Sequence, residues 1–475
     1  MIPPPGNVHL DEAIEQARAV LEGVLENGAL RKAVLVNDLF GRIRVAVWPA
    51  HEDPELAASL ATRLSAACKA LWSGSIWIAS AENTPASEHD SLADAAWSGG
   101  IPTDRSDRLR INDRHRSRTS WFSAPSAAPI APPPIVAFYS FKGGVGRTTA
   151  AAAFALNWAR RGKRVAALDV DLDAPGLGKL LDADGEGTTA RWGVVDYLLE
   201  QGVDLPLDDY RHTCARAKVT GDGVIDVYPS GRVNEHYLAK LSKLDLEMAT
   251  ANEASKAQAN PLERLLSRLQ ADSHPDLIVL DSRAGLSPAA GLVLGGIAHV
   301  HVVVSTAGEQ ALDGLRVVIR RLGEARIYAD QPQAECVLVQ AMIPDHPELG
   351  ARAIAHFDTT AEDIFREHYY ARPKGKRDDD YLSDPGADRR EVDDDDGTWT
   401  LADLDSSEAP HRAVGIRYKS KFADFRRIDD IADDLVNDPD YMQLAARIDQ
   451  RLGQFESHVN DDDSDPGEAG PADAS

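Results

Sequence analysis

The sequence has few cysteines and no long apolar run. Only three of its 475 residues are cysteine, and Cys68, Cys214 and Cys336 lie far apart, with no Cys-x-x-Cys pair. This odd, scattered set excludes a disulfide framework and a zinc cluster, and it is typical of a reducing compartment. The longest apolar stretch, residues 289–304, contains glycine and histidine. It is shorter than the roughly 20 residues that a membrane-spanning helix needs.

Basic residues are also scarce. Lys and Arg total 51 against 76 Asp and Glu, which gives a net charge of −25. Such a charge repels nucleic acid and anionic membranes unless a local basic patch outweighs it. Much of the surplus lies in two acidic stretches, for which we predict a disordered insertion at 373–410 and a disordered tail at 456–475. The first residues lack the basic and apolar regions of a signal peptide, so we expect a cytoplasmic protein with no membrane contact.

The length allows two or three domains, and 43% hydrophobic with 27% charged residues is typical of a folded globular protein. Apolar spacing and turn residues predict a small α+β domain over residues 1–100. Its expected elements are a helix at 10–25, a hairpin of strands at 32–36 and 42–48, a helix at 54–71 and a strand at 75–79.

Residues 101–134 are predicted to be a linker. Its first part, 105–118, is rich in arginine, and its second part, 123–134, is rich in proline and alanine. The arginines allow two interpretations, a grip on RNA, DNA or nucleotide phosphate, or a contact with the acidic segments of the same chain.

Buried strands then alternate with helices over 135–455. This alternation predicts an α/β domain with a mostly parallel sheet and helices on both faces. The expected strands are 135–140, 164–168, 224–228, 277–280, 300–305, 335–340 and 414–417, and the clearest helices are 148–161, 261–271 and 310–322.

The segment from Ile135 to Ala150, IVAFYSFKGGVGRTTA, is a strand followed by a glycine-rich loop and the start of a helix. Glycines let backbone N–H groups turn toward an anion, and the N-terminus of a helix adds a partial positive charge. This order predicts a phosphate site, with Thr148 where a P-loop hydroxyl binds Mg²⁺.

The order Lys-Gly-Gly-x-Gly-basic-Thr-Thr resembles the deviant Walker A motif of the MinD/ParA-like (SIMIBI-class) P-loop ATPases, in its KGGVGR-motif variant branch. The resemblance covers about 135–420 and implies ATP and Mg²⁺ as cofactors and a homodimer that forms on ATP binding. It also implies that Lys142 acts catalytically on the ATP of the partner subunit. The residues expected to bind the nucleotide are Gly143, Gly144, Val145, Gly146, Arg147, Thr148 and Thr149.

Arg147 departs from the family motif, because it stands where the ordinary P-loop lysine is found. Arginine keeps the charge and can bind phosphate with two N–H groups, but its planar head is larger than an ammonium group. We therefore expect nucleotide binding to survive and leave two outcomes open for hydrolysis, slow turnover or none.

Carboxylates follow two predicted strands, at the edge where ligands of parallel sheets bind. Asp169 and Asp171 resemble switch I, which implies that both act in catalysis and that Asp169 also belongs to the Mg²⁺ shell; Asp173 is expected to be a turn or cap residue. Asp281 resembles the Walker B aspartate and is expected to hold Mg²⁺ together with Thr148. Arg283, just beyond it, is assigned neither to phosphate nor to an acidic partner.

Two further positions are weaker candidates. Gln340 follows a late strand where the family reads adenine, and its amide can donate and accept hydrogen bonds. It is equally consistent with a polar residue that closes a strand. His299 and His301 alternate along another strand, but no third metal ligand is evident, so we expect packed or surface histidines.

The leading hypothesis is a dimerising, Mg-dependent ATPase switch that signals to a protein partner through the N-terminal domain. Family resemblance associates some members with bacterial defence or signalling operons. A non-hydrolysing nucleotide-binding scaffold or sensor is the first alternative. A ParA-like DNA-partitioning ATPase is the second, because Arg316, Arg320, Arg321 and Arg326 lie on or near one helix. Nucleic acid is thus an unfavoured but open partner.

Overall fold

A computed structural model of the chain forms two compact units, Met1–Ser123 and Ala124–Ser475, which are described separately. The structure describes residues 8–51, 53–79, 88–103, 105–114, 121, 133–200, 205–244, 261–328, 334–373, 391–392 and 398–462. In the described part of the chain, no helix is both long and apolar enough to cross a membrane.

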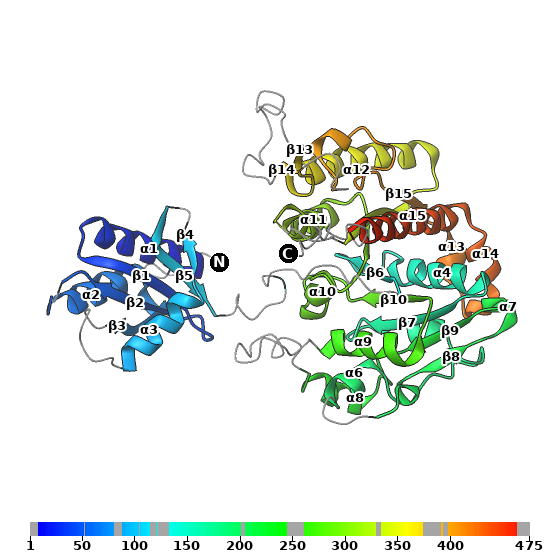
Figure 1. Cartoon of the computed structure of the whole chain (residues 1–475), viewed down its shortest axis with the longest axis horizontal. Helices are drawn as coiled ribbons and strands as arrows, with labels where there is room; N and C mark the ends of the chain where they lie inside the picture. The colour runs from blue at the N-terminus through cyan, green and yellow to red at the C-terminus, as the bar shows by residue number, and fades with distance from the viewer. Residues whose placement is uncertain are drawn as a thin grey trace, which may run out of the picture. The chain divides into compact units, whose positions relative to one another are not determined.

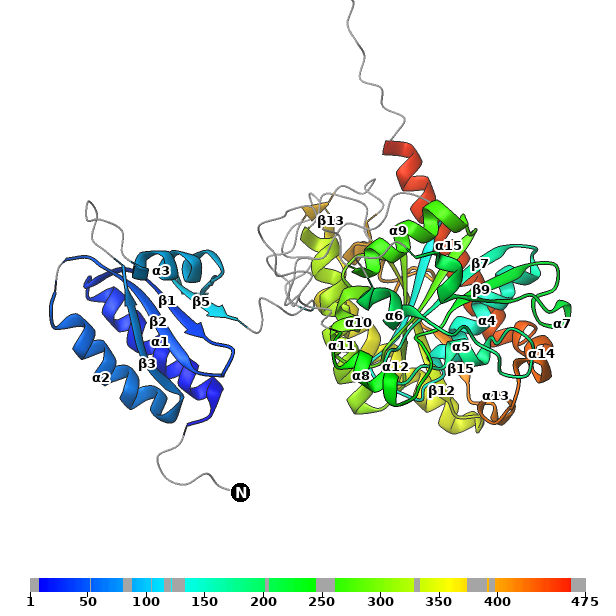
Figure 2. The ribbon, with the colours of Figure 1, turned by 90° about the horizontal axis from the view of Figure 1, so that it is seen from below.

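The N-terminal unit is a five-stranded sheet with the order β3-β2-β1-β5-β4. Its strands are β1 (Leu30–Asn37), β2 (Ile43–Pro49), β3 (Trp72–Ile78), β4 (Ile101–Thr103) and β5 (Ser106–Asp113). Strands β1 and β2 pair antiparallel, as the predicted hairpin requires. Helices α1 (Leu10–Glu26) and α2 (Leu56–Cys68) cover one face, and α3 (Glu88–Ser98) covers the other (Figure 2). This central sheet is therefore buried on both sides.

The arginine-rich segment is not the linker that the sequence predicts. Residues 106–113 form β5, which pairs parallel to β1 inside the sheet. Leu109 is fully buried against the helices, while Arg110 lies over the ring of Trp97 at 4.4 Å. The alternation of apolar and basic residues is that of a strand with one face on the core and with arginines that bind within their own unit.

The larger unit is built on an eight-stranded sheet with the order β15-β12-β11-β6-β10-β7-β9-β8. Its strands are β6 (Ile135–Ser140), β7 (Arg164–Val170), β8 (His212–Cys214), β9 (Val224–Tyr228), β10 (Leu277–Ser282), β11 (Val300–Ser305), β12 (Glu335–Ile343) and β15 (Val414–Arg417). All neighbours pair parallel except β8 with β9. The predicted α/β class with a mostly parallel sheet is confirmed.

Helices cover both faces of this sheet (Figure 1). One layer comprises α4 (Arg147–Arg160), α7 (Ala217–Thr220), α14 (Ala432–Val436) and α15 (Pro439–Asp462). The other comprises α6 (Val194–Leu199), α8 (Glu235–Leu241), α9 (Pro261–Ser273), α10 (Pro288–Val293), α11 (Glu309–Tyr328) and α12 (Pro347–His368). In β6, Val136 and Phe138 face the first layer while Ile135 and Ala137 face the second. Burial on both faces explains why the strands are apolar at nearly every position.

Two predicted boundaries of disorder are corrected. In the acidic insertion, residues 374–390 and 393–397 lie outside the described part, but 398–410 are placed. There Leu401 is buried and the Trp399 indole donates to Glu335 at 3.0 Å, so apolar and aromatic residues fix this end of the insertion. The last helix, α15, continues to Asp462, past the predicted start of the tail at 456. Residues 463–475 lie outside the described part.

Candidate functional site

The glycine-rich loop lies between β6 and α4, as predicted. Gly144 and Gly146 adopt φ values of +73° and +86°, which residues with a side chain rarely take. Gly146 is the N-cap of α4, which has 14 residues, so the loop closes onto the N-terminus of a full helix. Backbone amides at such a position favour an anion.

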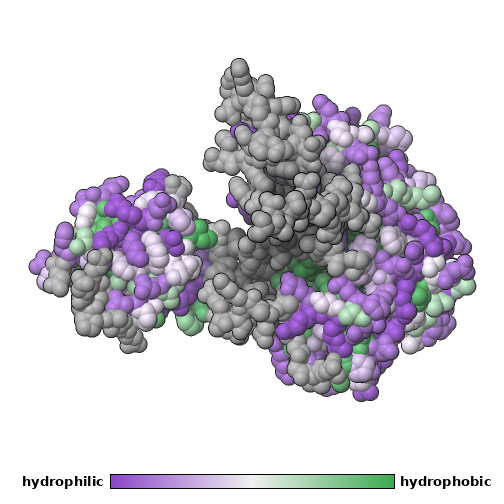
Figure 3. All heavy atoms as spheres, viewed as in Figure 1, coloured by the Kyte–Doolittle hydropathy of each residue, from purple (hydrophilic) through white to green (hydrophobic). Residues whose placement is uncertain are grey.

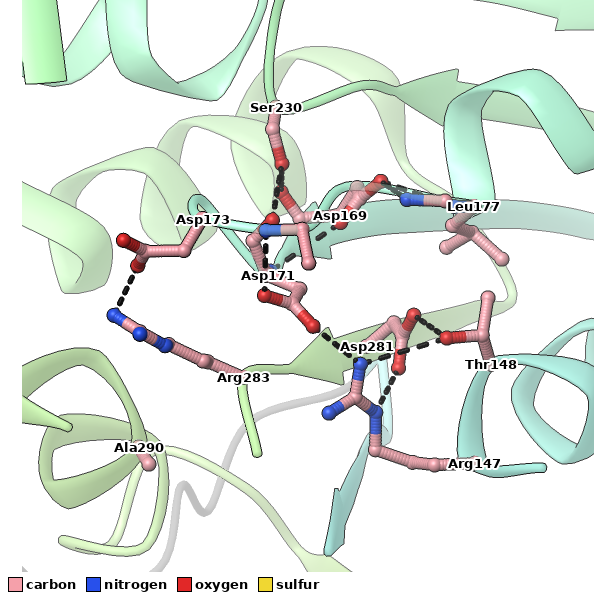
Figure 4. Close-up of polar contacts among 12 residues, drawn as sticks. Arg147, Thr148, Asp169, Asp171, Asp173, Leu177, Ser230, Asp281, Arg283 and Ala290 are labelled. Atoms are coloured by element: carbon pink, nitrogen blue, oxygen red, sulfur yellow. Dashed lines mark hydrogen bonds and ion pairs between the residues drawn. The ribbon is translucent and has the colours of Figure 1, made fainter. Parts of the chain in front are cut away.

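Arg147, the first residue of α4, is buried among carboxylates (Figure 4). Its Nε donates to Asp281 at 2.6 Å and its Nη2 donates to Asp171 at 2.8 Å. The Thr148 hydroxyl donates to the second oxygen of Asp281 at 2.7 Å. Since Asp171 follows β7 and Asp281 lies on β10, adjacent parallel strands bring the predicted residues together.

Burial dominates the electrostatics of this network. Burial raises the pKa of Asp281 above its ordinary value, and the opposing charge of Arg147 only partly offsets that effect. Burial acts to lower the pKa of Arg147, but Asp281 and Asp171 outweigh it and raise that pKa. A guanidinium held between two carboxylates is thus the charge arrangement of the site, and removal of one partner would leave a buried charge uncompensated.

Asp169, which was expected in catalysis and in the Mg²⁺ shell, contacts the backbone of the turn after β7. Its Oδ2 accepts the backbone N–H groups of Gly176 and Leu177, both at 3.0 Å, and its Oδ1 accepts that of Asp171. Burial, followed by the charge of Asp281, raises the pKa of Asp169 to about 8. The carboxyl group therefore helps to fix the turn after β7.

Asp173 and Arg283 form an ion pair that joins the loops after β7 and β10 (Figure 4). The sequence suggested a turn or cap for Asp173 and left Arg283 unassigned. Both residues line the cavity described below. The contact therefore links the two loops that flank Arg147.

The glycine loop opens into a cavity of about 640 Å³. All of the predicted loop residues from Gly143 to Thr149 line it, together with Asp171. The opposite wall includes residues that sequence reasoning missed, namely Met342, Ile416, Arg417, Tyr418, Lys419, Phe422, Phe425 and Tyr441. They belong to β12, β15 and the helices after β15, a part of the sequence with no recognisable motif. Phosphate-binding groups thus face a wall with aromatic and apolar side chains.

Four of the predicted site residues do not line this cavity, namely Lys142, Asp169, Asp281 and Gln340. Gln340 is buried, and its amide donates to the carbonyl oxygen of Ala353 in α12 at 3.0 Å, so the structure supports its alternative role as a polar residue within the fold. Lys142 is exposed and forms no ion pair with any described residue.

The donor set of the site suits Mg²⁺ better than a transition metal. Within the described residues, no three His, Cys, Asp or Glu side chains are grouped as they are around a fully protein-bound metal. Mg²⁺, however, binds through one or two carboxylates with water and substrate phosphates. Thr148 and Asp281 supply such hard oxygens. His299, just before β11, and His301, within β11, are both buried, and burial lowers the pKa of each to about 4.

The chain was compared with families, curated proteins and solved structures. No curated protein matches the chain. Among solved structures, the chain is similar to pNOB8 ParA bound to nonspecific DNA, with 15% identity, a TM-score of 0.40, and coverage of 67% of this chain and 98% of the other. The cell division ATPase MinD of Pyrococcus furiosus gives 21% identity, a TM-score of 0.31, and coverage of 45% and 73%.

A third structure is cobyrinic acid a,c-diamide synthase from Mycobacterium smegmatis with bound ADP and magnesium. It gives 18% identity, a TM-score of 0.34, and coverage of 47% of this chain and 79% of the other. The family model described as the CobQ/CobB/MinD/ParA nucleotide binding domain matches residues 136–437, more than half of the chain. The chain therefore belongs to the CobQ/CobB/MinD/ParA family of P-loop nucleotide-binding domains.

Proposed function

We propose that this protein is an Mg-dependent ATPase that works as a dimerising switch. The observation that carries this proposal is the meeting of Arg147, Thr148, Asp171 and Asp281 beside a cavity lined by the glycine loop. These are the charges that phosphoryl transfer requires, a cation and amides for the phosphates and oxygens for the metal.

Arg147 is the moving part of the proposed switch. Its Nε and Nη2 hold the two carboxylates, whereas Nη1 has no hydrogen-bond partner among the described residues. That free group can receive a phosphate oxygen first. Full engagement of the phosphates then draws the guanidinium away from Asp171 and Asp281, which releases Asp171 to position the attacking water.

Thr148 and Asp281 would hold Mg²⁺ once the guanidinium has moved. The metal would neutralise charge that develops on the β- and γ-phosphates. The chain's own contribution is to place the Thr148 hydroxyl next to a carboxylate oxygen of Asp281. A hydrogen bond of 2.7 Å joins the two groups.

The apolar wall is the proposed base site. Met342, Ile416, Tyr418 and Phe422 line the cavity together with the phosphate loop. Aromatic and apolar surface suits a nucleobase, which stacks on flat side chains. Adenine recognition is therefore assigned to this wall in place of Gln340.

Lys142 completes the site from a second subunit in this proposal.

The N-terminal unit carries the state of the switch to a protein partner. Its clearest contact feature is the β1–β2 turn, where Phe40 is 87% exposed while Asp38 accepts the backbone N–H groups of Phe40 and Arg42 at 2.9 Å each. A fixed turn that presents an aromatic side chain is typical of an interaction site.

Phosphate release measured over a range of protein concentrations tests the proposal. Specific activity should rise with concentration as dimers form. Lys142→Ala should retain ATP binding and lose turnover, whereas the control Lys218→Ala, an exposed lysine on α7, should behave as wild type. Equal turnover by Lys142→Ala and wild type would contradict action across a dimer.

A non-hydrolysing sensor is the second candidate, and the capture of Arg147 by two carboxylates favours it. In that case nucleotide would bind and change the protein's association without phosphate release. Arg147→Lys separates the two functions, because a shorter, more compact cation should raise turnover in a slow ATPase and leave a sensor inactive.

A further inference from the structure

A second hollow, of about 440 Å³, lies on the larger unit and shares no lining residue with the glycine-loop cavity. We call it the basic hollow and define it by Arg191, Trp192, Arg232, His236, Lys240 and Lys243. The first two residues precede α6, and the others lie before, on and after α8. Two neighbouring connections thus contribute all of its charge.

Most of these cations have no acidic partner. Among the described residues, Arg191, Arg232 and Lys243 form no ion pair, while Lys240 pairs with Asp196. No acidic side chain of the described residues lines the hollow. Like charges held close together repel each other, so this arrangement lowers stability unless an anion binds there.

Several other surface cations of the same unit have acidic partners. Arg160 pairs with Asp433, Arg161 with Asp449, and Arg427 with Glu186. Hydrophilic residues predominate on the described surface of the unit that Figure 3 shows. Acidic partners are abundant in a chain of net charge −25, and yet three cations that form no ion pair with a described residue line one hollow.

An aromatic side chain lies among the cations. The guanidinium of Arg191 lies 4.7 Å from the ring centre of Trp192, and Trp192 is 36% exposed. This contact holds a flat surface beside the charged groups. Phosphate and an aromatic base are the two chemical groups that such a pair of features recognises.

We propose that the basic hollow is a second anion site, which takes a small phosphorylated molecule of the nucleotide class. Its volume falls in the range of small-ligand pockets, roughly 300–1,000 Å³. A nucleic acid backbone would instead follow an extended basic stripe, and the chain as a whole is strongly acidic. A compact ligand with phosphates and a base fits the concave shape and the mixed lining.

The walls of the basic hollow are tied to the loop that carries Asp169 and Asp171. The hydroxyl of Tyr237, on α8, donates to the carbonyl oxygen of Leu172 at 2.6 Å. Ser230, just before the hollow's second connection, donates to the carbonyl oxygen of Asp169 at 2.7 Å. A ligand that orders these connections therefore acts directly on the loop beside Arg147.

Calorimetric titration of the full chain with inorganic pyrophosphate tests this proposal, because pyrophosphate can bind both at the glycine loop and in the hollow. Wild type should bind two per chain. Arg232→Glu/Lys243→Glu should bind one, with affinity for the second lowered roughly tenfold or more. Lys218→Glu/Arg352→Glu is the matched control, since it reverses an exposed lysine and arginine elsewhere and should keep both sites.

The conservative pair Arg232→Lys/Lys243→Arg should retain the second site, which separates charge from misfolding. Equal stoichiometry in wild type and Arg232→Glu/Lys243→Glu would overturn the proposal. So would binding of a DNA duplex in the hollow without binding of pyrophosphate or ADP. One bound pyrophosphate that is lost in Arg232→Glu/Lys243→Glu would support the hollow and contradict the glycine-loop function instead.

Discussion

The glycine-loop cavity and the basic hollow both contain cations, but their charges are compensated in different ways. At the glycine loop, Arg147 is buried and its charge is compensated by Asp171 and Asp281. In the basic hollow, Arg191, Arg232 and Lys243 lack acidic partners among the described residues. In the first arrangement, a ligand must replace ion pairs that already exist within the protein. In the second, the negative charge of a ligand would compensate cations that have no acidic partner among the described residues.

The difference shows how the same residue types serve two purposes. A buried ion pair costs desolvation, and its partners stabilise the fold only together. An exposed cluster of like charge contributes little to stability, and in the basic hollow its proposed role is to bind an anion. Unfolding measurements on single variants can therefore tell the two arrangements apart.

The largest effect is expected for Asp281→Ala. It leaves the Arg147 guanidinium and the Thr148 hydroxyl without a buried partner, so the free energy of unfolding of the larger unit should fall by about 3–5 kcal/mol. Urea unfolding measures this change. The control is Asp433→Ala, which removes the 72% exposed partner of Arg160 and should cost at most about 1 kcal/mol. Similar losses in both variants would erase the distinction between buried and surface pairs.

The next effect concerns a core histidine whose protonation is opposed by burial. The Nδ1 of His299 accepts the backbone N–H of Ile135 at 2.9 Å, and burial lowers the His299 pKa to about 4 from 6.5. The unfolded chain binds this proton below about pH 6.5 and the folded chain does not, so folding stability falls as the pH drops from 7 to 5. This residue should account for about 2 kcal/mol of that loss at pH 5.

His299→Asn should remove this share of the pH dependence, as urea unfolding at pH 7 and pH 5 would report. His346, which is exposed at the start of α12, provides the control variant His346→Asn, with an unchanged pH profile. An identical profile for His299→Asn and wild type would mean that this core histidine takes up its proton as it does in water.

A smaller effect is expected at the wall of the basic hollow. The Asn234 side chain accepts the backbone N–H of Tyr237 at 3.0 Å and caps α8. Asn234→Ala should cost about 1 kcal/mol. Faster hydrogen exchange should be confined to α8 and the loop that Tyr237 contacts. Ser242→Ala, at the other end of α8, is the control, and exchange that spreads through the whole sheet would argue against a local wall.

The smallest effect is expected for Arg232→Ala. An exposed cation without an acidic partner adds little to the fold, so the free energy of unfolding should change by less than about 0.5 kcal/mol. Arg147→Ala in the same assay should cost several times more, because it leaves two carboxylates buried together. A large loss in Arg232→Ala would show that the hollow is held together by contacts of its own cations.

The sheet and the phosphate loop were predictable because their signals are local. Buried strands are apolar on both faces, and the glycines, Arg147 and Thr148 are consecutive in the sequence. Strand β5 was missed because its arginines obscured the alternation of Leu109 and Ile111 with polar residues. Composition alone predicts a linker at residues 106–113, whereas the structure shows a strand that pairs with β1.

The roles of individual side chains depended on contacts between distant segments. Asp169 and Asp171 are alike in sequence, and only the turn toward Gly176 and Leu177 assigns the first to the backbone and leaves the second to Arg147. The residues of the cavity wall from Met342 to Tyr441 share no sequence motif. A surface for a nucleobase requires apolar side chains but no fixed spacing between them. The basic hollow likewise combines separate segments of the chain, the residues before α6 and those around α8.

Binding of radiolabelled ATP by equilibrium dialysis tests the central claim most directly. The full chain with Arg232→Glu/Lys243→Glu is the protein to use, because that background removes the contribution of the basic hollow. The account predicts one ATP per chain in the presence of Mg²⁺, with binding strongly weakened by the further change Arg147→Ala. Absence of bound ATP in the background protein, while it remains folded, would contradict the claim that the glycine loop and its buried cation form a nucleotide site.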